Sequence, residues 1–201
     1  MPLRFPELTQ LPLERYGSLM SAQRLQRIMD RIAVMRAQLT GRAVWNVSSA
    51  AVGGGVAEMV RSLLSYARGA GVDARWAVIE APPEFFRITK RLHHAIHGSM
   101  GDGTSIGERE RRIYEEVTAE NAAELAPMVR PHDVVIVHDP QPAGMIPALL
   151  TLGAHVIWRC HIGQDEVNAE VERGWQFLAP YIQGANGYVF SRQAYVPATY
   201  I

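Results

Sequence analysis

The chain has 201 residues, enough for one well-buried domain, and its 48% hydrophobic and 20% charged residues are typical of a folded globular protein. Twenty basic residues balance twenty acidic ones. Because nucleic-acid binding needs clustered positive charge, this balance gives no support for a nucleic-acid partner.

Cysteine usage and the most apolar segments bear on the compartment. A single cysteine, Cys160, excludes an internal disulfide, and the opening MPLRFPELTQ lacks the apolar stretch of a signal peptide. We therefore expect a cytoplasmic protein. The most apolar window, 145–158, is too short to cross a membrane and contains Pro147, Gly153 and His155. We expect no membrane partner.

Residues 1–41 are predicted to form an N-terminal helical extension. Apolar side chains recur at helical spacing over 22–39, and Gly41 follows as a helix stop. A β-prone run begins directly after Gly41. We therefore expect the domain proper to span 42–201.

Within this domain, apolar runs alternate with helical patterns. Strands are expected at 42–49, 73–79, 133–139, 154–161 and 187–191. Helices are expected at 56–68, 84–97, 108–125, 143–152 and 167–182. Such alternation implies βαβ crossovers. The fold class is therefore α/β, an open parallel, Rossmann-like sheet with helices on both faces.

Ligands of open α/β sheets bind outside the carboxyl ends of the strands. After the first strand, Gly53, Gly54 and Gly55 open a helix, where free N–H groups and the helix dipole favour an anion or a sugar hydroxyl. The pattern is neither G-x-G-x-x-G nor a Walker loop, so neither a nicotinamide cofactor nor P-loop chemistry is predicted. A tight helix entry without a ligand is the alternative.

Two further strand ends carry polar groups. His138, Asp139 and Gln141 in HDPQPAG follow a buried strand and could hold the hydroxyls of a sugar. Asp139 could equally be only the N-cap of the next helix. His161 follows the next strand, with Arg159 two residues earlier on the same strand face. At this place in this fold, His161 is a stronger candidate for function than an isolated histidine.

Several segments occur in an order that resembles the N-terminal half of retaining GT-B glycosyltransferases. The segments are GGGVAE (53–58), FFRITKRLHHAIHG (85–98), VIVHDPQPAG (135–144), WRCHI (158–162), NAEVERGWQFLAPYI (168–182) and VFSRQAYVP (189–197). Within that group the segments resemble those of the trehalose-forming glycosyltransferring synthases and the trehalose phosphorylases. The resemblance covers residues 42–197, and the ordered set is far more specific than any one motif.

The resemblance implies a two-lobed enzyme that moves a sugar from a nucleotide-sugar donor to a small sugar acceptor, such as glucose to form trehalose. This chain would be the N-terminal lobe of the GT-B fold and would bind mainly the acceptor. A second Rossmann-like lobe would bind the donor. No metal and no cofactor besides the donor substrate are implied.

Carried over residue by residue, the resemblance gives each strand end a role. Gly53–Gly55 match the glycine loop whose amides face the donor phosphates and the reacting sugars. Asp139, with His138 and Gln141 beside it, matches the acid expected to hold acceptor hydroxyls. His161 matches a catalytic histidine that contacts the donor sugar near the reacting carbon, where it would stabilise an oxocarbenium-like transition state.

Weaker candidates and departures complete the comparison. Glu58 and Lys90 lie in matching motifs without a firm role, and Arg159 is a weaker candidate from its strand position. Gly163 stands where the trehalose-forming enzymes more often carry an acid, and the printed chain ends after AYVP, where the family continues into the donor lobe. The chain would then hold half an active site. A stand-alone sugar- or nucleotide-binding module is the alternative function, and a homodimer is left open.

Other chemistry-bearing residues are better explained by structure. His93, His94 and His97 offer zinc-like spacing, but no acid or further ligand accompanies them, so we expect surface residues and no metal site. Cys160 at a buried strand end is expected to pack in the core rather than act as a nucleophile.

Overall fold

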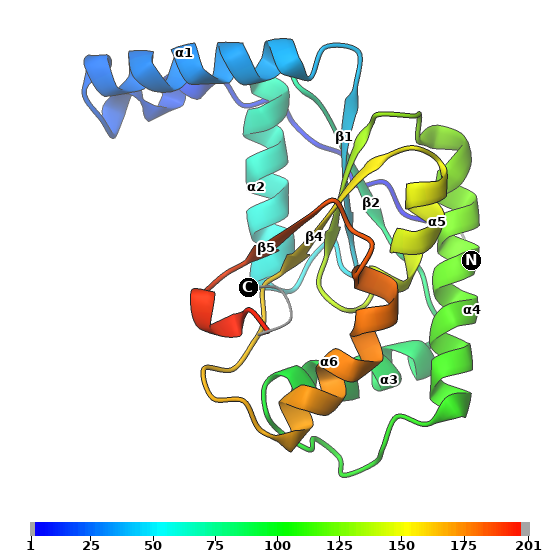
Figure 1. Ribbon diagram of the computed structural model, residues 1–201. Coiled ribbons are helices and arrows are strands. Elements are labelled where there is room, and N and C mark those ends of the chain that lie inside the picture. Colours follow the sequence, from blue (N-terminus) through cyan, green and yellow to red (C-terminus); the bar gives the residue numbers. More distant parts are fainter. Residues whose placement is uncertain (1–2, 198–201) are drawn as a thin grey trace.

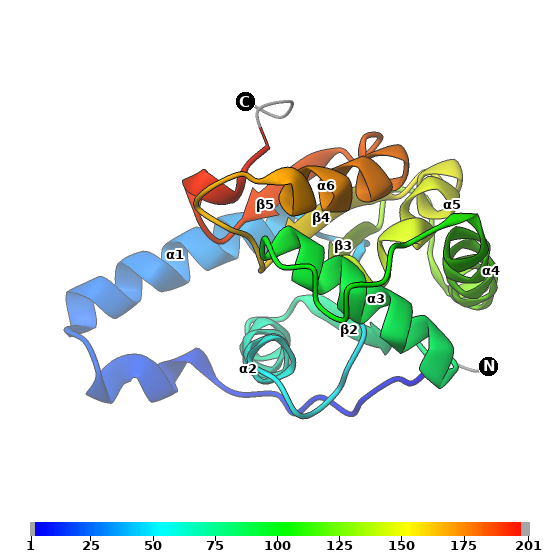
Figure 2. The same cartoon turned by 90° about the horizontal axis from the view of Figure 1, so that it is seen from below.

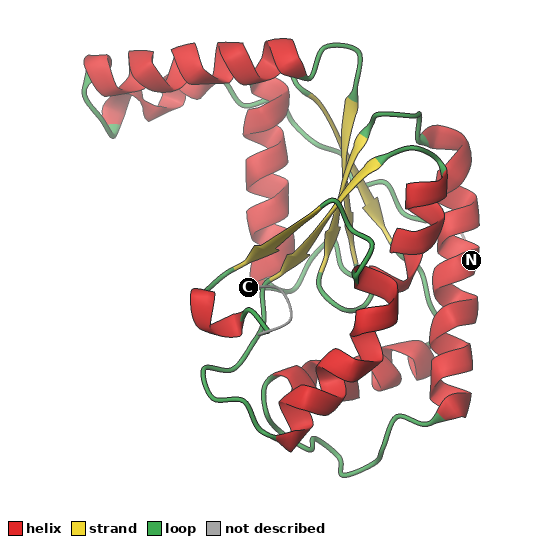
Figure 3. Ribbon diagram, viewed as in Figure 1, coloured by secondary structure: helices red, strands yellow, loops and turns green. Residues whose placement is uncertain are grey.

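The computed structural model describes residues 3–197, which form one sheet of five parallel strands with helices on both faces (Figure 1 and Figure 3). The strands are β1 (Ala43–Ser48), β2 (Asp73–Val78), β3 (Val134–His138), β4 (His155–Cys160) and β5 (Gly187–Phe190). Their order is β2-β1-β3-β4-β5. The α/β, Rossmann-like expectation is confirmed, and each strand lies inside its expected range.

The helices divide unequally between the two faces of the sheet. Seen from below, α2 (Gly55–Gly69) lies on one side, whereas α4 (Glu108–Leu125) and α5 (Ile146–Thr151) lie on the other (Figure 2). The remaining helices of that second side are α3 (Pro83–Ile96) and α6 (Ala169–Ile182), which pack against each other. A parallel sheet covered in this way has both faces of its central strands buried.

One expected helix is wrong in detail. The segment 143–152 forms a 3-10 turn, η3 (Ala143–Met145), followed by the short helix α5. Pro147 lies in the first turn of α5, where its missing N–H costs nothing, so the α-helix starts there rather than at Ala143. Helix α6 begins at Ala169 rather than 167, because the Asn168 side chain accepts hydrogen bonds from the N–H groups of Glu170 and Val171.

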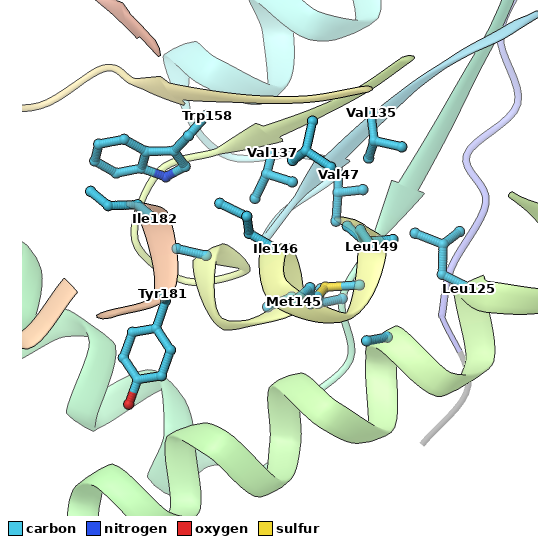
Figure 4. Packing of buried hydrophobic residues seen from close by; sticks show 14 of the residues in the cluster. Val47, Leu125, Val135, Val137, Met145, Ile146, Leu149, Trp158, Tyr181 and Ile182 are labelled. Atoms are coloured by element: carbon cyan, nitrogen blue, oxygen red, sulfur yellow. The ribbon is translucent and has the colours of Figure 1, made fainter. Parts of the chain in front are cut away.

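The larger hydrophobic core lies on the side of α3 to α6. Every second residue of the central strands faces this side, and such residues, among them Val47, Val137 and Trp158, are fully buried there. Figure 4 shows these side chains meeting Ile146 and Leu149 of α5. On the opposite face, a smaller cluster joins β2 to α2; its buried members are Ala57, Val60, Leu64, Ala74, Trp76 and Val78.

The N-terminal segment begins with residues that contact the sheet and continues into a helix that projects from the domain. Helix α1 (Ala22–Gln38), preceded by the 3-10 helix η1 (Leu13–Ser18), buries no residue and projects from the body (Figure 1). The helix at 22–39 is thus confirmed. Leu3 nevertheless lies in the main core, and Arg4 exchanges two backbone hydrogen bonds, of 3.0 and 2.8 Å, with Val78. The division into 1–41 and 42–201 stays a prediction, although Leu3 and Arg4 belong to the sheet region.

No helix among residues 3–197 is both long and apolar enough to cross a bilayer.

Candidate functional site at the strand ends

Four polar residues gather on the α2 face of the sheet. In the strand register, His138 at the end of β3 lies opposite Arg159 of β4, and Asn46 of β1 lies opposite Ile136, two residues before His138. Side chains two apart on a strand share a face. The structure therefore brings together His138, Arg159 and His161, as their strand-end positions predicted.

The two histidine rings form a hydrogen-bonded chain that ends on an amide. His138 Nδ1 lies 2.9 Å from His161 Nε2, and the rings are inclined by only 10°. His138 Nε2 lies 2.8 Å from Oδ1 of Asn46, a residue only 5% exposed. Sequence reasoning missed Asn46; the available signal was one amide inside the otherwise apolar strand run VWNV.

Both histidines are held neutral. Burial is the main reason that the pKa of His138 falls to about 3, followed by electrostatic repulsion from a proton on His161 and from Arg159. Burial and then Arg159 lower the pKa of His161 to about 4. At neutral pH each ring therefore carries a single proton.

Asp139 joins the ends of β3 and β4. Its carboxylate accepts a hydrogen bond of 2.7 Å from the His161 backbone N–H, while its own N–H donates to the Arg159 carbonyl at 2.8 Å. Asp139 adopts a φ of 64°, a left-handed conformation that is uncommon for a residue with a side chain. Burial is the main reason that the pKa of Asp139 rises to about 6.

The alternative interpretation of Asp139 as a helix cap is wrong. The N-cap of η3 is Pro142, and no side-chain hydrogen bond caps that turn. The carboxylate is occupied instead by the backbone of the next strand end. Its expected contact with acceptor hydroxyls stays a prediction.

A buried tyrosine clamps the loop that carries Asp139. The Tyr114 hydroxyl donates to the Pro140 carbonyl at 2.7 Å and accepts from the Gly144 N–H at 2.8 Å. Trp158 Nε1 donates to the Asp139 carbonyl at 3.0 Å. Because these bonds are made inside the core, the strand-end loop is held in one conformation. This preorganises the polar groups that it presents.

The glycine run leaves open space where it enters α2. Gly53 has a φ of 80°, the left-handed region that favours glycine, and Gly54 is the N-cap of α2 without a side-chain hydrogen bond. A Cβ added at Gly53, Gly54 or Gly55 would meet no atom within 4 Å. The protein itself therefore does not require glycine at Gly54 and Gly55 for packing. A ligand contact is consistent with this, and that role stays a prediction.

The other candidates are more scattered. Arg159 is half-buried, and its Nη2 lies 3.6 Å from Sδ of Met59 on α2. Gln141 has a buried Oε1 without a hydrogen-bond partner among residues 3–197. Glu58 on the first turn of α2 and Lys90 on α3 are both exposed, and neither acquires a role from the geometry.

The histidines of α3 and Cys160 were expected to have structural explanations. His93 is half-buried rather than a surface residue, and burial followed by the charge of Lys90 lowers its pKa to about 4. Within residues 3–197, no group of three or more His, Cys, Asp or Glu side chains is arranged to hold a metal ion. Cys160 is fully buried, and burial raises the pKa of its thiol, in agreement with a packing role.

A separate cavity of about 320 Å³ lies between α3, α6 and the loop that follows α3. Arg91, Ala95, Arg111, Arg173 and Phe177 are among its lining residues. None of the residues predicted from the strand ends lines it. Two of its three arginines are engaged with acids, Arg91 with Asp102 and Arg173 with Glu170, so the cavity is not a second array of free charges.

Comparison with protein sequences identifies a family. Residues 46–197 match the family described as "Trehalose synthase, N-terminal domain". A trehalose synthase of Pyrococcus horikoshii is 35% identical over 184 residues, which cover 92% of this chain and 41% of the relative. A trehalose synthase of Rubrobacter xylanophilus is 36% identical over 162 residues, covering 80% of this chain and 38% of the relative. This chain thus spans about two fifths of the length of these relatives.

More distant similarities extend the comparison. A trehalose phosphorylase of Pleurotus pulmonarius is 28% identical, over 71% of this chain and 21% of the relative. Among solved structures, a trehalose-phosphate synthase of Burkholderia vietnamiensis superimposes with a TM-score of 0.58 at 17% identity, covering 77% of this chain and 41% of that one. At this identity the likeness shows the fold alone, and it confirms the N-terminal lobe of a GT-B fold. With its fold and the matched segment 46–197 in agreement, the chain belongs to the trehalose synthase N-terminal domain family.

Proposed function

We propose that the chain is the acceptor-side lobe of a two-lobed retaining glycosyltransferase. The enzyme would move a sugar from a nucleotide-sugar to a small sugar acceptor, and glucose is the acceptor that would yield trehalose. The observation that carries the proposal is the preorganised polar cluster of His138, Asp139 and His161 at the carboxyl ends of adjacent strands. This is the edge at which open α/β sheets bind ligands.

The second lobe is part of the proposal. This chain spans 41% of the Pyrococcus horikoshii trehalose synthase, which leaves room in such a protein for a donor lobe. The strand-end cluster lies partly open on this lobe, with His161 half-buried and the glycine run exposed. A lobe closing over these groups would exclude water and hold donor and acceptor in reacting geometry. The cytoplasm is the expected compartment of this enzyme.

Each group would act by ordinary physical chemistry. The exposed N–H groups at Gly53–Gly55 would approach the donor phosphates, aided by the positive end of the α2 dipole. Asp139 would accept hydrogen bonds from acceptor hydroxyls with the carboxylate oxygen that the His161 N–H does not occupy. The neutral His161 ring would stabilise the positive charge that develops at the donor carbon.

Three substitutions in the two-lobed protein test these roles by steady-state kinetics. Gly54→Val should abolish transfer and leave the fold intact, because the added side chain meets only space that a ligand would occupy. Asp139→Ala should mainly raise the acceptor KM, since its hydrogen bonds are made in the ground state as well. His161→Ala should lower kcat by roughly 10²-fold with little change in acceptor KM.

A matched control separates these effects from general damage. His155 is exposed at the start of β4, the strand whose other end leads into His161. His155→Ala should therefore leave both kcat and the acceptor KM near wild type. Circular dichroism verifies folding of each variant. If Asp139→Ala and His161→Ala also left rate and affinity unchanged, the strand-end site would be wrong. Sugar or nucleotide binding without turnover by the two-lobed protein would favour the alternative of a binding module.

A further inference from the structure

The chain Asn46–His138–His161 has a definite direction for its protons. An amide oxygen can only accept a hydrogen bond, and it is Oδ1 of Asn46 that lies 2.8 Å from His138 Nε2. In this orientation of the amide, whose Nδ2 is buried without a hydrogen-bond partner among residues 3–197, His138 Nε2 carries the proton. Because His138 is neutral, its Nδ1 is left without a proton and is an acceptor.

The same reasoning fixes the second ring. His138 Nδ1, now an acceptor, lies 2.9 Å from His161 Nε2, so this Nε2 must donate. His161 is also neutral, and its single proton is thereby placed on Nε2. The remaining nitrogen, Nδ1, carries a lone pair and has no hydrogen-bond partner among residues 3–197.

Burial makes this arrangement hold firmly. His138 is 2% exposed and Asn46 5% exposed, so neither can exchange its partner for water. Arg159, next to both rings, further disfavours a second proton on either, and burial acts in the same direction. The carboxylate of Asp139 approaches the His161 backbone rather than its ring, so it offers no competing acceptor for the ring proton.

We propose that Asn46 and His138 are positioning residues that fix the proton of His161 on Nε2, so that His161 accepts a hydrogen bond from a sugar hydroxyl through Nδ1. The assignment of the hydroxyl to the substrate rests on the proposed function. The Nδ1 lone pair would also place partial negative charge beside a bound sugar, which favours a transition state with positive charge. A histidine with the opposite tautomer would direct an N–H at that charge.

The tautomer can be measured without any catalytic activity. In the 201-residue chain labelled with ¹⁵N-histidine, long-range ¹H–¹⁵N spectra at neutral pH should show His161 protonated on Nε2 and bare on Nδ1. A ¹⁵N–¹⁵N coupling across the hydrogen bond should connect His161 Nε2 to His138 Nδ1. A proton found on His138 Nδ1, or on His161 Nδ1, would overturn the proposal whatever reaction the protein performs.

Matched variants on β1 test the role of Asn46. Asn46→Leu removes the acceptor, so in part of the molecules both neutral rings should take the opposite tautomer, with the His138 proton on Nδ1, donated to His161 Nε2, and the His161 proton on Nδ1. Ser48 is equally buried on the same strand face but bonds Trp76 Nε1 instead, so Ser48→Ala should leave His161 as in the wild type. If Asn46→Leu left the proton as firmly on His161 Nε2 as Ser48→Ala does, Asn46 would not be a positioning residue.

Donor and acceptor analogues connect the tautomer to the proposed reaction. In the two-lobed protein, the sugar hydroxyl that contacts His161 should be needed as a donor. Its replacement by hydrogen or by fluorine should then lower kcat/KM to a similar extent, on the order of 10-fold or more. Suppose instead that, at every hydroxyl whose removal lowers kcat/KM, the fluoro analogue reacts as well as the natural sugar. His161 would then not accept a hydrogen bond from a sugar hydroxyl, although the measured tautomer would still stand.

Discussion

The two faces of the sheet bury different kinds of side chain. Toward α3 to α6, strand residues such as Val47, Val137 and Trp158 form a continuous apolar core. Toward α2, the same strands carry Asn46 and His138 near their carboxyl ends, and the apolar cluster is confined to β2 and its contact with α2. One face therefore supplies most of the packing, while the other can hold polar groups that packing alone would not select.

Two neighbouring phenylalanines, Phe85 and Phe86, should differ strongly in their contribution to the free energy of unfolding. Phe85 is fully buried and stacks on Tyr114 with ring centroids 5.8 Å apart, whereas Phe86 is 38% exposed. Phe85→Ala should lower the free energy of unfolding by about 3–5 kcal/mol, because it removes a large buried ring and leaves a cavity.

Phe86→Ala is the matched control for this prediction. It should cost about 1 kcal/mol, since much of its ring already contacts water. Urea denaturation of the 201-residue chain measures both. Equal losses of unfolding free energy for the two variants would show that burial of Phe85 against Tyr114 contributes less to stability than the structure indicates.

Glycines on the two faces should differ in how much a methyl group destabilises the fold. A Cβ at Gly144 would lie 2.4 Å from Thr118 Oγ1 and 2.9 Å from Tyr114 Cε1, so Gly144→Ala should cost about 1–3 kcal/mol. At Gly54, with an extended φ of −178° and no atom within 4 Å, Gly54→Ala should change stability by less than about 0.5 kcal/mol.

Thermal unfolding of both glycine variants measures this contrast. A severe loss for Gly54→Ala would mean that the glycine run serves the fold rather than a ligand. A small loss of stability for Gly144→Ala would show that the side chains of Tyr114 and Thr118 can move aside at little cost.

On the α2 face and at the strand ends, His138, His161 and Asp139 make stability depend on pH. The lowered pKa values of His138 and His161 contribute stability above pH 6.5, and this is lost as the pH falls toward their folded values of about 3 and 4. Asp139 acts in the opposite sense. Its pKa of about 6 lies above the ordinary 3.8, so it contributes stability below pH 3.8 that is lost as the pH rises through 6.

Asp139→Asn removes that opposing contribution and keeps an acceptor for the His161 N–H. Near pH 5, stability should therefore fall more steeply on acidification than in the wild type, by about 1 kcal/mol per pH unit. Urea midpoints at pH 7, 6 and 5 measure the slope. An unchanged or shallower slope would contradict the burial of the carboxyl group.

The sequence predicted most of the architecture because periodic apolar patterns dominate it. The strands at 43–48 and 134–138 were found from local runs alone. Residues 3–4 were missed, since one antiparallel bridge to Val78 leaves no periodic signal. The split of helix 143–152 depended on the position of Pro147 within the turn, which the apolar pattern does not report.

Residues of the candidate site could be predicted from the sequence only where they lie at the end of a strand. His138, Asp139 and His161 are predicted from the sequence because they lie at the carboxyl ends of buried strands. Asn46 could not be found in that way, since it lies inside a strand and contacts His138 across 92 residues of sequence. The Asp139 contact with the His161 N–H likewise depends on the register between β3 and β4, which no local pattern encodes.

Reconstitution can show whether this lobe holds half of a glycosyl-transfer site. Transfer from a nucleotide-sugar to glucose is measured for the 201-residue chain alone and for the chain joined to a donor lobe, each with a His161→Ala counterpart. We expect no transfer by the chain alone, transfer when the donor lobe is present, and a loss of roughly 10²-fold in the joined His161→Ala protein. Turnover by the 201-residue chain alone, above its His161→Ala control, would show that this lobe is not half of such a site.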